Sequence, residues 1–315
     1  MVISTSGQKN FSLKVGMIRI GTCSWAEKTL ISSGEFYPQE VRSAEERLRY
    51  YASRFDTVEI DSTYYAIPPV RNAFLWAERT PDEFVFHIKA FGGLTGHGVS
   101  PEVLPKEILK DISVSAREKR FIYLRDREVI RHVMSLFLES VSPISEGGKL
   151  GLLVFQFPPW FRYGKGQIDH LVFLKELTSP YRVGIEFRHG SWLNRKNREN
   201  TLSILRDLEF TYIIADEPWY GTEATVPYLP ATTTDTGYFR LHGRNRKNWL
   251  RKGIETSLRY DYDYSDEELR GFIPDIQRIG STTRECYIMF NNCHGASAVK
   301  NALRLIELIK DLNNG

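Results

Sequence analysis

Eight short segments typical of β-strands, several of them with period-two alternation, recur along this 315-residue chain. They lie within residues 17–23, 57–61, 84–89, 149–157, 183–188, 210–216, 238–244 and 286–292. Segments with helical spacing separate most of them, which favours a parallel α/β sheet. Eight such units predict a single (β/α)8 barrel of the TIM type. An open, doubly wound sheet is the alternative, but no glycine-rich dinucleotide fingerprint follows the first strand.

Two connections depart from the regular strand–helix unit. Residues 91–149, after the third strand, are longer than an ordinary crossover. Within them, residues 126–141 have a helical pattern, and residues 92–121 are interpreted as an insertion or lid. No clear helical pattern fills residues 217–236, so the helix between strands six and seven is predicted to be missing or irregular.

The composition is that of a soluble globular protein, with 42% hydrophobic and 26% charged residues. No apolar run of about 18 residues indicates a transmembrane helix. Residues 1–16 are polar, lack the apolar core of a signal peptide, and are expected to form a flexible tail. Residues 17–315 are predicted to form one barrel domain. Three cysteines are too few for a disulfide framework, so a cytoplasmic location without membrane contact is expected.

Polar side chains recur at the carboxyl ends of the strands, where barrels of this type carry their active sites. In GIEFRHGSW, residues 184–192, Ile185 and Phe187 lie on one face of a strand while Glu186 and Arg188 lie on the other. Buried charges are costly unless they are paired or used, so a shared pocket is predicted, with a closed polar layer as the alternative. The inward set is Glu59, Asp61, His87, Lys89, Gln156, Glu186, Arg188, Asp216, Arg240, His242 and Asn291.

The pocket combines carboxylates, which act as acids or bases, with cations that hold phosphate or carboxylate groups. The residues expected to be catalytic are Glu59, Glu186, His242 and Asp216. Those expected to bind substrate are Asp61, His87, Lys89, Gln156, Arg188, Trp192, Arg240, Arg244, Asn291 and Asn292. Mutual pairing of the carboxylates and arginines is the alternative interpretation. No cofactor is assigned, and a divalent metal is only weakly indicated because no spaced motif such as HExxH is present.

Aromatic and basic residues follow several of the strands. Five tryptophans lie after strands one, four, five, six and seven, where they would either stack on sugars or bases or cap the core. They are Trp25, Trp160, Trp192, Trp219 and Trp249. Residues 244–252 are basic and are interpreted as a solvated loop, with nucleic-acid contact as the alternative. The loop before residue 297 fits anion binding at a helix N-terminus and simple capping by Ser297 equally well.

Several motifs together resemble the YecE-like family, whose domain of unknown function 72 has a barrel fold. They are GTCSW, GEFYP, TVEIDSTYYAIP, TPDEFVFHIKA, GKLGLLVFQFPPWF, GIEFRHGSW, YFRLHGR, YDYSDEEL and FNNCHGASAVKNA. The resemblance spans residue 17 to about 312 and implies the barrel. It also places Glu59, Gln156, Glu186, Arg188, Arg240, His242, Gly243, Arg244, Asn291 and Asn292 in shared motifs, without implying a reaction. Asp61 stands where the family tends to have Asn, which makes this pocket more acidic.

Three functions follow from these observations. The first is an enzyme with an ionic, tryptophan-rimmed pocket that acts on a small anionic substrate, bearing phosphate or sugar, by acid/base chemistry. The second is a nucleic-acid-binding or metal-dependent phosphodiesterase-like protein that uses residues 244–252. The third is a non-catalytic ligand-binding scaffold, which the fold alone does not exclude.

Overall fold

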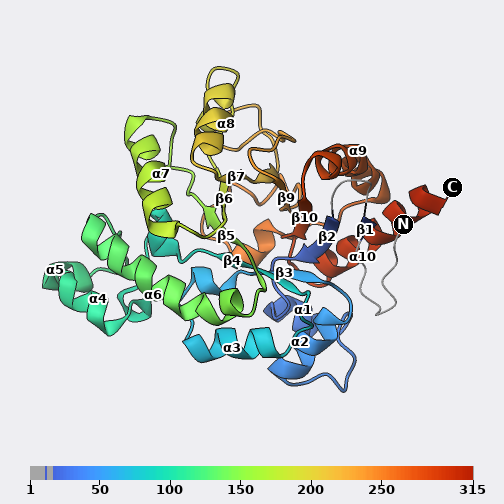
Figure 1. Cartoon of the computed structure of the whole chain (residues 1–315), viewed down its shortest axis with the longest axis horizontal. Coiled ribbons are helices and arrows are strands. Elements are labelled where there is room, and N and C mark those ends of the chain that lie inside the picture. Colours follow the sequence, from blue (N-terminus) through green and yellow to red (C-terminus); the bar gives the residue numbers. More distant parts are fainter. Residues whose placement is uncertain (1–10, 13–16, 315) are drawn as a thin grey trace.

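The computed structural model of the chain describes residues 11–12 and 17–314 (Figure 1). Apart from Phe11–Ser12, the predicted N-terminal tail lies outside the described residues. All strands of the described chain form one sheet. They are β1 (Phe11–Ser12), β2 (Met17–Thr22), β3 (Thr57–Ile60), β4 (Val85–Lys89), β5 (Leu150–Gln156), β6 (Val183–Glu186), β7 (Thr211–Tyr212), β8 (Ile214–Asp216), β9 (Thr236–Leu241) and β10 (Glu285–Phe290).

The sheet curves into a closed barrel. Its two terminal strands, β7 and β8, follow each other in the chain and together fill one strand position, here called a stave. The order is β7-β6-β5-β4-β3-β2-β10-β9-β8, with every neighbouring pair parallel. Only Ile213 separates β7 from β8, so β7 pairs with β6 on one side and β8 pairs with β9 on the other. The nine parallel strands are therefore eight staves, and the predicted TIM-type barrel is confirmed.

Helices surround the barrel and bury their apolar faces against the outer side of the strands (Figure 1). They are α1 (Lys28–Ser33), α2 (Ala44–Ala52), α3 (Val70–Glu78), α4 (Lys106–Asp111), α5 (Val114–Arg117), α6 (Arg127–Glu146), α7 (Lys165–Thr178), α8 (Arg198–Asp207), α9 (Asp266–Thr282) and α10 (Ser297–Asn314). Residues 217–235 hold no helix, so β8 leads to β9 through a loop. Pro274 lies inside α9 without ending it.

Local sequence signals explain several of these boundaries. Ser43 begins α2 through a capping box, because its hydroxyl accepts from Glu46 N–H while the Glu46 carboxylate accepts from Ser43 N–H. Ser265 and Glu268 form the same arrangement at α9. Gly151 in β5 leaves space for a neighbouring ring, since a Cβ there would lie 2.5 Å from His87 Nδ1.

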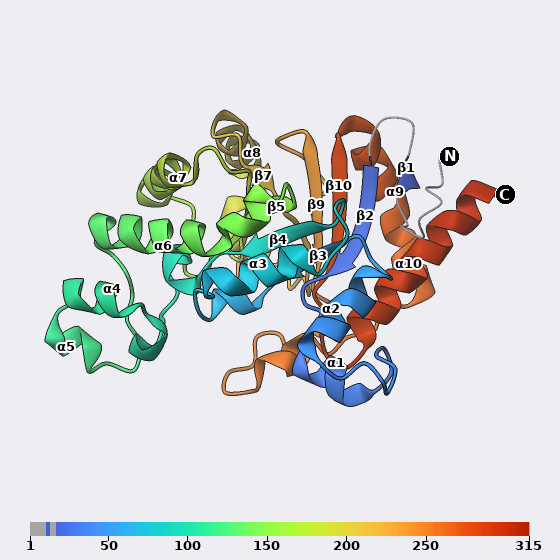
Figure 2. The ribbon, with the colours of Figure 1, turned by 60° about the horizontal axis from the view of Figure 1, so that its bottom comes forward.

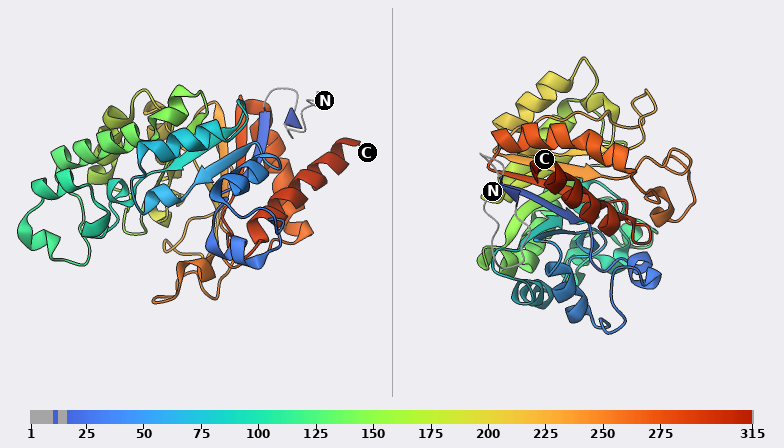
Figure 3. Two further views of the ribbon diagram at one scale, coloured as in Figure 1. Left: turned by 90° about the horizontal axis from the view of Figure 1, so that it is seen from below. Right: turned by 90° about the vertical axis from the view of Figure 1, so that its right-hand side faces the viewer.

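The segment between β4 and α6 extends away from the barrel. It contains the short helices α4 and α5, which project beside α6 at one end of the molecule (Figure 2). A single bridge between Val99 and Ile122 closes this segment on itself. In the side view, the loop after β9 lies near α1, at the edge where the strands end (Figure 3, left). No helix among the described residues is long and apolar enough to cross a membrane.

The barrel interior holds its own small apolar cluster, separate from the larger core between strands and helices. Leu152, Val154, Tyr238, Tyr287 and Met289 belong to it. Interior and exterior side chains alternate along each strand, so each stave sends every second residue toward the barrel axis. Above this apolar cluster, toward the strand ends, the inward positions become charged.

Candidate functional site at the barrel mouth

Three fully buried charged side chains meet inside the barrel. Glu59 on β3, Glu186 at the end of β6 and Arg240 on β9 have no exposed surface. Arg240 donates from Nε and Nη2 to Glu59 at 3.1 and 2.7 Å, and from Nη1 to Glu186 Oε2. The guanidinium therefore bridges two carboxylates and offsets the cost of burying them.

Glu186 is the acceptor on which this group converges. Besides Arg240, it accepts from Gln156 Nε2 at 2.6 Å and from Arg188 Nη1 at 3.4 Å, and it lies 3.0 Å from His242 Nε2. Burial alone would raise the pKa of Glu186, but Arg240 and His242 outweigh it and hold that pKa well below its usual value. The carboxylate therefore stays ionised, and its oxygens are occupied by donors.

His242 lies between Glu186 and Asn291. The amide nitrogen of Asn291 is 2.8 Å from His242 Nδ1. Because an amide nitrogen only donates, Nδ1 accepts and Nε2 carries the proton that faces Glu186. Burial lowers the pKa of His242 to about 4, although Glu186 opposes the shift. The ring is therefore neutral near pH 7 and orients Glu186.

Glu59 differs from Glu186 although both contact Arg240. Complete burial raises the pKa of Glu59 to about 7; Arg240 opposes this shift and the nearby Asp61 carboxylate adds to it. The Tyr238 hydroxyl donates to Glu59 Oε2 at 2.8 Å from below. The inner cluster, defined as Glu59, Glu186, Arg240 and His242, thus pairs one firmly ionised carboxylate with one that titrates near neutrality.

A cavity of about 700 Å³ lies above the inner cluster at the mouth of the barrel. Its walls come from the ends of, and the loops after, β2, β3, β4, β5, β6, β9 and β10. Five of the predicted site residues line it: Asp61, Lys89, Gln156, Arg188 and Asn291. The mouth cavity therefore joins side chains from five different staves, as barrel active sites do.

Two of the three Lys and Arg side chains that line the mouth cavity are paired with a carboxylate, whereas the third, Arg259, donates to Arg251 O. Lys89 Nζ lies 3.3 Å from Asp61 Oδ1, and this pairing outweighs burial and raises the pKa of Lys89. Arg188 Nε lies 2.9 Å from Glu217 Oε2. Burial raises the pKa of Glu217 to about 7 against the pull of Arg188. Both pairs border the cavity, so a bound anion would compete with a carboxylate for each cation.

The loop after β9 covers the inner cluster. Trp249 is buried in this loop, and the Arg188 guanidinium lies 4.8 Å from its ring centroid. Tyr260 packs edge-on against Trp249 at 5.5 Å, and both rings lie about 6 Å from the His242 ring. Arg188 and these two rings separate Glu186 from the mouth cavity.

Several residues of the site were not in the predicted set, among them Glu217, His97 and Tyr260. Glu217 pairs with Arg188 and shares the inward face of its strand with Ile213, a face that the sequence does not single out because both faces there are apolar. His97 lines the cavity, and its Nδ1 is 2.8 Å from Thr95 Oγ1. Tyr260 comes from a long irregular loop, where no periodic pattern indicates direction.

Asp216 and Arg244, also in the predicted set, point outward from the barrel. Arg244 Nε and Nη2 donate to Asp216 at 2.8 to 3.1 Å, and the Tyr264 hydroxyl donates to Asp216 at 2.7 Å. Arg244 also reaches Glu268 on α9 at 3.2 Å. This outer cluster of Asp216, Arg244, Tyr264 and Glu268 joins β8 to α9 and lies outside the mouth cavity.

Three more predicted substrate-binding residues lie elsewhere. Asn292 donates to Tyr262 O and to Asn301, on the outer side of the barrel. Trp192 is fully buried, stacked on Phe187 at 4.2 Å. His87 is buried inside the barrel, where its Nδ1 accepts from Leu152 N–H at 2.9 Å, and burial holds its pKa well below the usual value. All three act in packing rather than at the cavity.

The remaining tryptophans divide between the core and the mouth. Trp160 lines the cavity and is 58% exposed, which fits a ring available for stacking. Trp25 is buried and packs edge-on against Trp76 at 5.8 Å. Trp219 is exposed. Within residues 11–12 and 17–314, no three His, Cys, Asp or Glu side chains are arranged to hold a metal ion.

A closed parallel barrel with a polar cavity at the carboxyl ends of its strands defines a TIM-type α/β protein. The chain belongs to the DUF72 family, described as a protein family of unknown function, whose model matches residues 19–314.

Relatives of the same family match the chain over nearly its whole length. The UPF0759 protein YunF of Bacillus subtilis is 29% identical over 296 residues, covering 93% of this chain and 95% of YunF. The crystal structure of a DUF72 family protein from Thermotoga maritima has a TM-score of 0.74 at 31% identity, covering 93% of this chain and 99% of that one. A DUF72 family protein from Enterococcus faecalis gives 0.75 at 26% identity, covering 93% and 96%.

Proposed function

We propose that the mouth cavity is the active site of an enzyme that binds a small anionic substrate and performs acid/base chemistry on it. The observation that carries this proposal is the pair of cations, Lys89 and Arg188, bordering a cavity of about 700 Å³. A cavity of this size accommodates a small metabolite. Phosphate or carboxylate would be bound by these cations through charge-assisted hydrogen bonds.

Asp61 is the proposed acid/base residue. Its side chain is 25% exposed and lines the cavity, whereas Glu59 and Glu186 have no exposed surface. Asp61 lies beside Glu59, whose pKa of about 7 lets it hold or release a proton near neutral pH. Glu59 would act as a proton store behind Asp61. Glu186, Arg240 and His242 are positioning residues in this proposal.

The test measures binding by calorimetry with inorganic phosphate and with sugar phosphates. Lys89→Met removes one cation from the cavity, and Arg244→Met removes one from the outer cluster. We expect at least a tenfold weaker affinity for Lys89→Met, and a change of less than about twofold for Arg244→Met. Equal affinities in all three proteins, or no binding to the wild type, would contradict the proposal and favour a scaffold.

A second candidate is a nucleic-acid-binding or phosphodiesterase-like function through residues 244–252. It is favoured by the exposure of Lys247, Arg251 and Lys252 on the loop that also borders the cavity through residues 255–260. This candidate requires that the chain bind DNA or RNA with an affinity that falls steeply with salt concentration. It also requires that binding be lost when Lys247, Arg251 and Lys252 are replaced together.

A further inference from the structure

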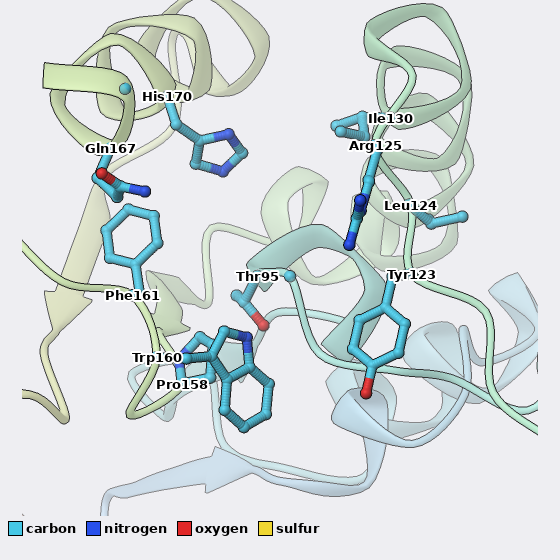
Figure 4. Close-up of a pocket in the computed structure, with 12 residues that line it drawn as sticks. Thr95, Tyr123, Leu124, Arg125, Ile130, Pro158, Trp160, Phe161, Gln167 and His170 are labelled. Carbon is cyan, nitrogen blue, oxygen red and sulfur yellow. The ribbon is translucent and has the colours of Figure 1, made fainter. Parts of the chain in front are cut away.

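A second cavity of about 620 Å³ lies next to the mouth cavity, and Trp160 borders both. One wall comes from the segment between β4 and α6, and the other from the β5–α7 connection and α7 (Figure 4). It is lined by Thr95, Gly96, Tyr123, Leu124, Arg125, Ile130, Pro158, Trp160, Phe161, Gly166, Gln167 and His170. None of the residues of the inner cluster reaches it.

The first wall is formed by an extended segment with two different faces. Ile122 and Leu124 are buried at 5% and 7% exposure, whereas Phe121 and Tyr123 are 46% and 50% exposed. Arg125 continues the exposed series at the same period of two. Apolar rings are seldom left this exposed in neighbouring positions, so a face carrying two rings and a guanidinium indicates a surface for binding.

Arg125 has no partner among the residues that the structure describes. Two cations of the mouth cavity, Lys89 and Arg188, are each within 3.3 Å of a carboxylate oxygen. Arg125 therefore differs from them, because an incoming anion does not have to displace a carboxylate. An unpaired guanidinium at a cavity wall fits phosphate with two parallel hydrogen bonds.

Aromatic rings continue from this cavity into the mouth. The Trp160 ring lies 5.6 Å from that of His97, which lies 5.2 Å from that of Tyr64. In Figure 4, Trp160 and Tyr123 both face the space into which Arg125 points. Exposed rings beside a cation provide stacking for planar groups and charge for the phosphate attached to them.

We propose that this second cavity binds a nucleotide unit, with the base against Trp160 and Tyr123 and the phosphate on Arg125. The volume lies within the range of small-molecule sites. A free mononucleotide and a unit of a single-stranded nucleic acid offer the same chemistry. The inference rests on the geometry of this cavity and does not require the mouth cavity to be catalytic.

The test measures binding of adenosine monophosphate and of a short fluorescein-labelled oligothymidylate at low salt, with inorganic phosphate as competitor. Tyr123→Ala and Arg125→Ala each remove one contact, while Arg120→Ala removes an equal charge five residues earlier in the segment. Arg120 lies over the Phe121 ring and does not line the cavity. Melting curves of the purified variants identify any that fail to fold.

We expect Tyr123→Ala to weaken nucleotide binding about tenfold, because the base loses a stacking ring. We expect Arg125→Ala to weaken it about tenfold as well, because the phosphate loses its charge-assisted hydrogen bonds. Arg120→Ala should change nucleotide affinity less than twofold.

A single strand that binds far more tightly than the mononucleotide identifies a polymer ligand, and equal binding identifies a free nucleotide. Equal losses in Arg120→Ala and Arg125→Ala, competition by phosphate alone as strong as by nucleotide, or no binding would overturn the proposal. Retained sugar-phosphate binding at the mouth in these variants would leave the function proposed above intact.

Discussion

The inner and outer clusters use the same chemistry on opposite sides of the barrel wall. In each, one arginine makes hydrogen bonds to both oxygens of a carboxylate, and a tyrosine hydroxyl donates to that carboxylate. Arg240 of the inner cluster has no exposed surface, whereas 38% of the Arg244 side chain is exposed. The inner cluster lies beneath the mouth cavity without lining it, and the outer cluster joins a strand to a helix.

The comparison shows that the role of an arginine here depends on the direction in which its side chain points and not on its chemical type. Arg240 and Arg244 are four residues apart, but a strand carries Arg240 inward, and Gly243, with φ of +87°, turns the chain before Arg244. A Cβ at residue 243 would lie 2.5 Å from Tyr262 Cβ, so the turn excludes other side chains. The turn at Gly243 thus separates the inward role of Arg240 from the outward role of Arg244.

The largest effect that would test this comparison is expected for Arg240→Met. It leaves Glu59 and Glu186 buried without their shared cation, which costs about 3–5 kcal/mol of unfolding free energy. Arg244→Met is the matched variant and should cost about 1–2 kcal/mol, because Arg244 is partly exposed and Asp216 keeps the Tyr264 hydroxyl. Urea unfolding of both variants measures the difference. Similar losses would remove the distinction between the clusters.

Much of the fold could be predicted from the sequence because strand and helix periods differ and alternate eight times. Local sequence is also sufficient to predict the capping box of Ser43 with Glu46 and the loop between β8 and β9. The division of the sixth stave at Ile213 was not, since it depends on pairing with two different neighbours.

The site was predictable where strands alternate cleanly and not where they do not. Glu59, Glu186 and Arg240 face inward as the alternation requires. In the sixth stave both faces are apolar, so the sequence does not show whether Asp216 or Glu217 faces the axis. Asn292 follows Asn291 directly, and adjacent strand residues face opposite sides, so only one of them reaches the cavity.

Irregular segments gave no directional signal at all. Trp192 lies in a 3₁₀ turn and enters an aromatic stack, while Trp249 and Tyr260 reach the mouth from a long loop. The contacts of these rings are set by tertiary packing over long sequence separations. The sequence predicts tryptophans near the mouth of the barrel but does not show which of them pack in the core and which line the cavity.

A smaller effect is expected on the pH dependence of anion binding, which should involve the inner cluster and not the outer one. Because the pKa values of Glu59 and Glu217 are raised to about 7, raising the pH through 7 adds negative charge near Lys89 and Arg188. Affinity for an anion should therefore fall about tenfold between about pH 6 and 8. Calorimetry across this range should show a reduced slope for Glu59→Gln and an unchanged slope for Asp216→Asn.

The same substitution fixes the sign of the stability effect. The pKa of Glu59 in the folded state lies above its ordinary value of 4.5. The group therefore adds stability that is complete below about pH 4.5 and is lost as the pH rises through 7. Relative to Glu59→Gln, the wild type should lose unfolding free energy over this range. A constant difference between the two proteins would contradict the raised pKa.

A crystal soaked in selenate tests most directly whether the mouth cavity is the anion site, because anomalous scattering locates the ion independently of the protein. The account predicts a selenate peak in the mouth cavity, within hydrogen-bond distance of Lys89 and Arg188. It also predicts that Asp216 and Arg244 keep each other as partners. Peaks only on exposed arginines outside the mouth, or a selenate bound to Arg244 in place of Asp216, would contradict it.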